Sequence, residues 1–154
     1  MIKKIRTLIV SIYYNRSNMV DESISSVVKQ LDPQDVLLLV DDGSSDTTLE
    51  ELKRFEDNNI VVVSYENSGF TSSVSRAIAS IESEYVAIHG AGDLSLPGRF
   101  SAQAEILENQ PDVGLVGTWY EDYDITNNNS TIVGKALNAK ESTLMAKCNP
   151  FGHS

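Results

Sequence analysis

The feature that most constrains the fold is a regular alternation of short apolar segments with amphipathic ones. Strand-like segments rich in β-branched residues occupy residues 5–13, 36–40, 60–64 and 85–89. Between them, apolar residues recur at helical spacing: Val20, Ile24, Val27, Val28 and Leu31, then Leu49, Leu52 and Phe55, then Val74, Ala77, Ile78 and Ile81. Single helices between strands require right-handed crossovers, so the pattern predicts an α/β fold with a mostly parallel sheet flanked by helices.

The rest of the chain carries weaker patterns. A helix is expected over residues 99–108, a strand over 113–120, and a polar turn between short strands within 124–133. A further helix is expected over 139–145. The 154 residues have the length of one domain, and the sequence stops abruptly without a polar tail. We therefore expect a single domain over residues 1–154 that is truncated at its C-terminus.

Composition restricts the partners and the compartment. The net charge of −10, from 12 basic and 22 acidic residues, disfavours nucleic acid and anionic membrane surfaces. The apolar run near the N-terminus is only as long as a strand, so we expect neither a signal peptide nor an integral membrane segment. The single cysteine, Cys148, cannot form an internal disulfide. These observations favour the reducing cytoplasm.

The second predicted strand leads into an acidic loop, VLLLVDDGSSD at residues 36–46. Ligands of open α/β sheets bind beyond the carboxyl ends of the strands, so Asp41 and Asp42 are expected to face a crevice. Ser45 or Asp46 is expected to cap the helix that follows. Because capping by those residues accounts for neither Asp41 nor Asp42, at least one of the two is predicted to contact a ligand.

An aromatic wall is predicted beside this acidic pair, where Ile12, Tyr13 and Tyr14 end the first strand. A carboxylate accepts the imide N–H of uracil, and a tyrosine ring can cover a base or ribose by stacking. Side chains alternate along a strand, so the two tyrosines should point to opposite faces, and the sequence leaves open which one packs under the sheet. The arrangement suits a nucleobase.

Five sequence blocks together resemble family 2 glycosyltransferases. They are VSIYYN at 10–15, SISSVVKQ at 23–30, VDDGSSD at 40–46, ENSG at 66–69 and LPGRF at 96–100, and NPFGHS at 149–154 resembles a later stretch. The resemblance implies the GT-A (Rossmann-like) nucleotide-diphospho-sugar transferase fold, a nucleotide-diphosphate sugar donor, a saccharide acceptor and a divalent metal. By its place in the block, Asp42 resembles the family's base-binding aspartate, and Asn67 and Gly69 would form the adjacent wall.

The chain departs from the family at HGAGDL, residues 89–94, where Asp-x-Asp-Asp is usual. Gly90 and Gly92 replace two carboxylates, and Asp93 remains as the expected ligand of Mn²⁺ or Mg²⁺. Such an ion takes other oxygens from phosphates and water, so it should be held weakly without nucleotide. His89 is a second ligand, a phosphate contact or a satisfied structural residue, and Arg99 reaches the phosphates or pairs with an acidic neighbour. A second departure is Val74, Ser75 and Ala77, where the family commonly has Arg, Asn and Gly.

The resemblance implies a glycosyltransferase that moves a sugar, with UDP as the expected carrier, to a saccharide acceptor with inversion, in bacterial surface polysaccharide synthesis. Inversion needs a general base near the acceptor hydroxyl. No catalytic residue is assigned, because the family's base follows the metal motif and is expected beyond residue 154. The candidates within the chain are Glu121, Asp122, Asp124 and His153.

Three other functions share parts of this sequence pattern. A receiver-type signalling module shares the acidic pair, but it needs a third aspartate at a later strand end, where Ser64 and His89 stand. A dinucleotide-binding oxidoreductase needs a third glycine at position 95, which is Ser95. A non-catalytic domain that holds a nucleotide sugar without transferring it stays open, because the missing carboxylates permit it.

Overall fold

The computed structural model describes residues 4–124 and 126–133. The chain divides into two compact units, one that ends at Ala104 and one that begins at Glu105. Each unit is described by itself. The expectation of one domain over residues 1–154 stays a prediction.

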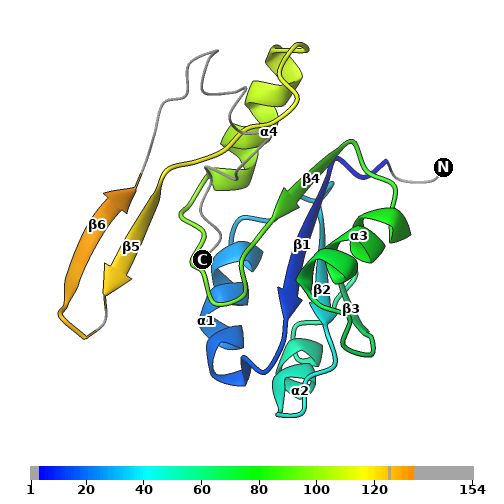
Figure 1. Ribbon diagram of the computed structural model, residues 1–154. Coiled ribbons are helices and arrows are strands. Elements are labelled where there is room, and N and C mark those ends of the chain that lie inside the picture. Colours follow the sequence, from blue (N-terminus) through cyan, green and yellow to red (C-terminus); the bar gives the residue numbers. More distant parts are fainter. Residues whose placement is uncertain (1–3, 125, 134–154) are drawn as a thin grey trace. The chain divides into compact units, whose positions relative to one another are not determined.

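The first unit is built on a four-stranded sheet in the order β3-β2-β1-β4, in which every neighbouring pair is parallel (Figure 1). Its strands are β1 (Thr7–Tyr13), β2 (Val36–Asp41), β3 (Ile60–Ser64) and β4 (Tyr85–Ile88). Its helices are α1 (Ser17–Val28), α2 (Thr48–Lys53) and α3 (Phe70–Ser80), and α4 (Arg99–Asn109) begins within it. The predicted parallel α/β arrangement is confirmed, with strand limits shifted by at most two residues.

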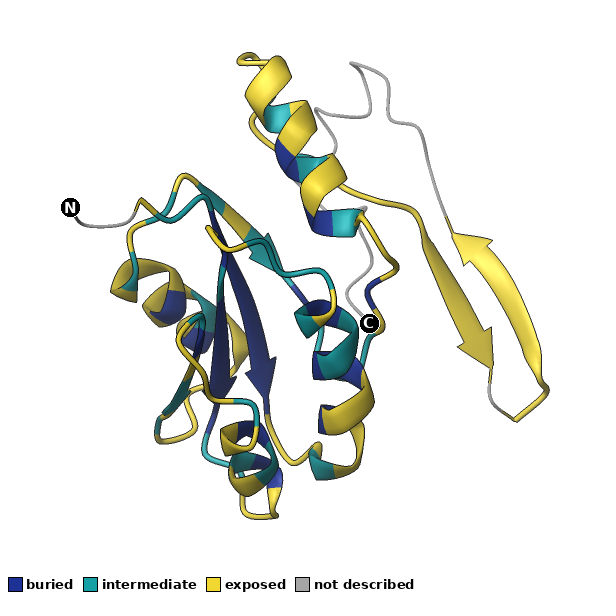
Figure 2. Cartoon of the chain, turned by 180° about the vertical axis from the view of Figure 1, so that it is seen from behind, coloured by how far each residue is buried: buried dark blue, intermediate teal, exposed yellow. Residues whose placement is uncertain are grey.

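Both faces of the sheet are covered, because the side chains of β1 and β2 alternate. Ile9 and Tyr13 of β1 pack with α1 and with Leu52 of α2, whereas Leu8, Val10 and Ile12 pack with Ala77 of α3. Figure 2 shows the two central strands as the buried centre of this unit. Right-handed crossovers explain the division: the chain moves outward from β1 through α1 and α2, then returns through α3 to the other side of β1.

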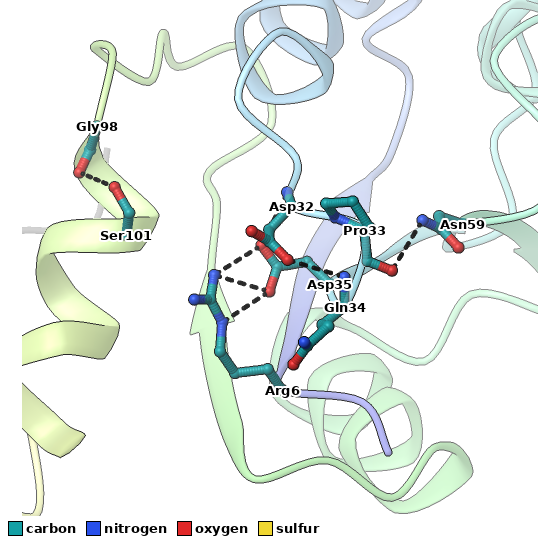
Figure 3. A network of polar contacts seen from close by, with 8 residues as sticks. All are labelled: Arg6, Asp32, Pro33, Gln34, Asp35, Asn59, Gly98 and Ser101. Carbon is teal, nitrogen blue, oxygen red and sulfur yellow. Dashed lines mark hydrogen bonds and ion pairs between the residues drawn. The ribbon is translucent and has the colours of Figure 1, made fainter. Parts of the chain in front are cut away.

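An ion pair joins the amino ends of β1 and β2, at the edge of the sheet opposite to the loops that follow the strands. The Arg6 guanidinium, just before β1, donates to both carboxylate oxygens of Asp35 at 3.3 Å (Figure 3). Asp35 is 1% exposed and also accepts the N–H of Asp32 at 3.2 Å. A buried carboxylate needs such partners, and this one joins the segment before β2 to the segment before β1.

The second unit contains an antiparallel hairpin of β5 (Tyr120–Asp124) and β6 (Asn129–Val133). The predicted polar turn between short strands is confirmed, but the strand predicted over 113–120 is wrong, since only Tyr120 belongs to one. Gly114 and Gly117 interrupt that segment, and it has no partner strand among the described residues, so its apolar character does not produce a strand. The helix predicted over 139–145 lies outside the described residues.

No helix in the described ranges is long and apolar enough to cross a membrane.

Candidate functional site

The loops that follow the four parallel strands lie at one edge of the sheet and form the candidate site. They span residues 14–16, 42–47, 65–69 and 89–98. The strand order places the topological switch point between β1 and β4, because the chain leaves β1 in one direction and reaches β4 from the other. Open α/β sheets bind their ligands at this point.

Asn15 joins the loop after β1 to the loop after β2. Its φ of 51° lies in the left-handed region, which asparagine tolerates better than most residues. Its side-chain oxygen accepts the N–H of Ser45 at 2.8 Å, and its own N–H donates to the Ser44 hydroxyl at 3.0 Å. The two loops therefore form one connected edge.

Asp46 serves two helices at once. One carboxylate oxygen accepts the N–H of Thr48 at 2.9 Å, at the start of α2, and the other accepts the N–H of Ser17 at 3.3 Å, at the start of α1. Hydrogen bonds, the largest from the Thr48 hydroxyl, lower the pKa of Asp46 to about 2. The N-cap position of α2 is Thr47, and Asp46, one residue earlier, accepts the N–H of the first residue of both helices.

Asp42 is buried and holds the loop before α3. It is 2% exposed, and its carboxylate accepts the Ser73 hydroxyl at 2.6 Å, the N–H of Ser68 at 3.1 Å and the N–H of Gly69 at 3.0 Å. Burial raises the pKa of Asp42, but these hydrogen bonds outweigh it and leave the pKa below its ordinary value. In this conformation the loop encloses the carboxylate, and the expected contact of Asp42 with a ligand stays a prediction.

Asp41 is likewise used within the protein. It is 2% exposed, and it accepts the N–H of Ser44 at 3.1 Å and the Ser64 hydroxyl at 2.8 Å. The inference that capping leaves the acidic pair unexplained fails for a physical reason. Ser44 is a local partner of Asp41, but the other partners of the two carboxylates lie more than twenty positions further along the chain, and local patterns do not show them.

The remaining predicted wall residues occupy different environments. Ile12 and Tyr13 belong to the core, with Tyr13 fully buried, whereas Tyr14 is 52% exposed at the strand end. The alternation is confirmed, and it selects Tyr14 as the aromatic ring available to a ligand. Asn67 is exposed, and its side-chain amide donates to the Asp42 carbonyl at 2.8 Å. Gly69 contributes its N–H to the same aspartate, so the predicted neighbours of Asp42 are indeed assembled around it.

Gly43 lets the loop of residues 65–69 approach β2. Its φ is +73°, and a Cβ there would lie 2.6 Å from the backbone nitrogen of Asn67. Only glycine accommodates both conditions without a shift of backbone. The glycine of the VDDGSSD block therefore has a defined structural task.

Ser23 of α1 anchors the loop that follows β4. Its hydroxyl donates to the Asp93 carbonyl at 2.8 Å, accepts the Tyr13 hydroxyl at 3.1 Å and lies 3.0 Å from Nε2 of His89. A carbonyl can only accept, so the single proton of Ser23 goes to Asp93, and Nε2 of His89 must carry a proton and donate. The tautomer of His89 is thereby assigned.

The other nitrogen of His89, Nδ1, is then an acceptor. The Ser95 hydroxyl lies 3.1 Å from it and accepts from the Arg99 guanidinium at 2.9 Å. His89 is 1% exposed, and burial, assisted by the charge of Arg99, lowers its pKa to about 4. Of the alternatives for His89, the satisfied structural residue is the one that the structure supports.

Arg99 also serves the scaffold. Its second terminal nitrogen donates to the Ile88 carbonyl at 2.8 Å, and the side chain is half-buried. Burial lowers the pKa of Arg99, and the nearby charge of Asp93 acts in the opposite direction. The guanidinium therefore braces the loop after β4 against its strand, and the expectation that it reaches phosphates is not supported by this geometry.

Asp93 is the carboxylate at the switch point that fits a metal, though only in part. It is half-buried in a loop fixed through its own carbonyl, and its N–H donates to the Gly90 carbonyl at 3.0 Å. Within residues 4–124 and 126–133, no group of three or more His, Cys, Asp and Glu side chains could hold an ion. The residues fit an ion whose other ligands are water and phosphate oxygens.

Sequence reasoning missed the serines that hold the site together. Ser23 and Ser73 are buried, and both hydroxyls are hydrogen-bonded to residues on other elements. The available signal is the placement of a small hydroxyl on the apolar face of a helix, as Ser23 sits beside Ile24 and Val27. This pattern predicts that the hydroxyl makes a buried hydrogen bond, but it does not identify the partner.

The chain is similar to known proteins in sequence and in fold. The sequence profile described as Glycosyl transferase family 2 matches residues 8–147. An Escherichia coli relative, UDP-Glc:alpha-D-GlcNAc-diphosphoundecaprenol beta-1,3-glucosyltransferase WfgD, is 30% identical over 88% of this chain and 53% of its own length. The chain spans 15%, 34% and 51% of the length of the first three curated relatives that it matches.

Two solved structures share the fold. TarS 1–349 of S. aureus in complex with UDP-GlcNAc has a TM-score of 0.64 and 22% identity, over 70% of this chain and 32% of that one. The mannosyltransferase PcManGT of Pyrobaculum calidifontis, in complex with GDP-Man and Mn²⁺, has a TM-score of 0.62 and 20% identity, over 68% of this chain and 32% of that one. The predicted GT-A fold is confirmed.

Proposed function

The chain belongs to glycosyl transferase family 2, and from this membership we propose that its strand-end loops bind the nucleotide-diphosphate sugar donor of a glycosyltransferase. The observation that carries the proposal is the switch point between β1 and β4, which is flanked by the exposed Tyr14 and by the anchored loop of Asp93. An aromatic ring and a fixed carboxylate at this point suit the base and the diphosphate of one ligand.

The base is proposed to stack on Tyr14 and to be bounded by the loop of residues 66–69. Asp42 sets the position of that loop through Ser68 and Gly69. A carboxylate offers about four acceptor positions, and the three hydrogen bonds to Asp42 leave one, on Oδ2. Because Asp42 is 2% exposed, a base N–H can reach this position only if the loop opens, and Asp42 remains a proposed base-binding residue on that condition. UDP is favoured as the carrier, in line with the E. coli relative.

The sugar is proposed to pass to a saccharide acceptor with inversion, in the assembly of a bacterial surface polysaccharide and in the cytoplasm. The support is the family membership and the name of the E. coli relative, whose acceptor is a lipid-linked sugar. The chain spans about half of that relative, so the acceptor site and the general base are proposed for the complete protein. Of the candidate bases, Glu121, Asp122 and Asp124 are exposed on β5, and His153 lies outside the described residues.

A divalent ion, Mn²⁺ or Mg²⁺, is proposed to join the donor at Asp93. Bound there, it would neutralise charge on the diphosphate that leaves with the nucleotide. Because one carboxylate replaces little of the ion's hydration shell, the ion should bind weakly alone and tightly only with diphosphate. The metal and the nucleotide are thus expected to enhance each other's affinity by the same factor.

The experiment is a calorimetric titration of UDP, and of GDP for comparison, in Mn²⁺ and in chelator. For the natural chain we expect Mn²⁺ to tighten nucleotide binding by about 5–100-fold, the usual size of a coupling between two ligands. In Asp93→Asn the tightening should disappear while metal-free binding persists. Exposed Asp21, on α1, supplies the control Asp21→Asn, which should behave as the natural chain does. No detectable binding of either nucleotide would reject the proposed function, and equal enhancement in Asp93→Asn would reject the metal role of Asp93.

A further inference from the structure

Arg16 is a cation placed at the switch point by the backbone around it. Its N–H donates to the Thr48 hydroxyl at 2.9 Å, and it immediately precedes the first residue of α1. The side chain is exposed, and it forms no ion pair with any residue in the described ranges. Its position is therefore fixed while its charge is available to a ligand.

Met19 links Arg16 to the glycine-containing loop after β4. The Arg16 guanidinium lies 3.3 Å from the Met19 sulfur, and that sulfur lies 2.7 Å from the position that a Cβ of Gly92 would occupy. The two distances share the sulfur, so the guanidinium is within about 6 Å of the place where a side chain at position 92 would begin. The contact with the sulfur uses one of the five N–H donors of the guanidinium, so the others can reach a phosphate that is bound beside this loop.

The backbone conformation explains the glycine at position 92. Its φ of +98° disfavours other residues, and a side chain there would also meet the end of the flexible Met19 thioether. Position 92 therefore carries no charged side chain, and the residue just before α1 is the positively charged Arg16.

Three other arginines of the first unit are committed elsewhere. Arg99 donates to Ile88 and Ser95 inside the scaffold, Arg6 is paired with Asp35, and Arg76 lies over the ring of Tyr65 at 4.4 Å. The whole chain carries a net charge of −10, which repels an anionic diphosphate. A positively charged side chain at the switch point attracts the diphosphate and so offsets that repulsion locally.

We propose that Arg16 binds the diphosphate of the nucleotide donor beside the Gly90–Gly92 loop. Its positive charge adds to that of a metal ion, which Asp93 alone would hold only weakly. The inference deepens the proposed function and rests on it. A guanidinium forms paired, charge-assisted hydrogen bonds to phosphate oxygens, which a lysine ammonium reproduces only as a point charge. Arg16 is therefore a binding residue for the two phosphates and makes no contact with the base.

The test compares four proteins by calorimetry: the natural chain, Arg16→Gln, Arg16→Lys and the control Arg54→Gln. Arg54 is an exposed arginine paired with Glu51 at the end of α2. Each is titrated in chelator with UDP and with uridine, or with GDP and guanosine if the chain prefers guanine. We expect Arg16→Gln to raise the dissociation constant of the diphosphate at least 10-fold, Arg16→Lys to raise it less, and neither to change the nucleoside affinity. Arg54→Gln should change nothing.

The outcomes separate this inference from the function on which it rests. If the natural chain binds nucleotide and Arg16→Gln binds the diphosphate equally well, the role of Arg16 is refuted while the proposed function stands. If Arg16→Gln weakens diphosphate and nucleoside alike, the side chain acts on the fold or the base, and the inference is also refuted. If the natural chain binds no nucleotide, both fail together. Far-ultraviolet circular dichroism of each variant confirms that the fold is retained.

Discussion

Replacing Asp42 with alanine is expected to lower the free energy of unfolding by about 2–4 kcal/mol, because buried donors lose a charged acceptor. The hydroxyl of Ser73 and the N–H groups of Ser68 and Gly69 all bond to this carboxylate. Without it they must be hydrated or left unpaired, and the loop before α3 loses its attachment to β2. Nucleotide affinity should fall as a consequence, since the same loop bounds the proposed base site.

Denaturant unfolding of Asp42→Ala, Asp42→Asn and the exposed control Asp21→Ala measures this effect. An asparagine keeps one acceptor oxygen and should recover part of the loss, whereas Asp21 is exposed on α1 and should contribute within about 0.5 kcal/mol. An unfolding free energy for Asp42→Ala that matches the natural chain would show that the carboxylate does not hold the loop. In that case the charge of Asp42 would have to serve the ligand alone.

Acidification from pH 7 to pH 4 is expected to remove about 3 kcal/mol of stability through His89 alone. The folded pKa is about 4, against an unfolded value of about 6.5, because the ring is buried and faces Arg99. The unfolded chain therefore binds a proton in this interval and the folded chain does not. The contribution of neutral His89 is fully present above pH 6.5 and is lost as the pH falls toward 4.

Nuclear magnetic resonance titration of the histidine rings checks this directly. The chain has two histidines, so His153 is the only other signal and serves as an internal reference. The His89 midpoint should lie well below 6.5, and the protonated ring nitrogen should be Nε2. Unfolding measured across the same pH range should depend less steeply on pH in His89→Gln. A His89 midpoint near 6.5 would contradict the buried, neutral histidine and the proton order assigned to Ser23 and Ser95.

Periodicity predicted those parts of the fold that depend on local burial. The apolar spacing of Val20, Ile24 and Val27 predicts the face of α1 that is buried, and the alternation at Tyr13 and Tyr14 predicts one buried and one exposed ring. The strand predicted over 113–120 failed because apolar composition alone does not supply a pairing partner. Local patterns predict which face of a helix or strand is buried, whereas the pairing of strands depends on the whole fold.

The use of the acidic pair could not be read from the sequence. Asp42 is bonded to residues that follow it by more than twenty positions, and so is Asp41 through Ser64. The same holds for Ser23, whose partners His89 and Asp93 come from the loop after β4. A residue type suitable for ligand binding is equally suitable for holding a loop, and only the fold decides between the two.

The most direct test of the central claim is a two-dimensional amide spectrum of the isotopically labelled chain, recorded during titration with UDP or GDP in Mn²⁺. We expect shifts for amides in the strand-end loops of residues 14–16, 43–46, 66–69 and 90–93. Amides at the opposite ends of the strands, around Asp35 and Asn59, should remain unchanged and serve as the internal control. Shifts that are confined to that opposite edge, or none with either nucleotide at millimolar concentration, would contradict donor binding at the switch point.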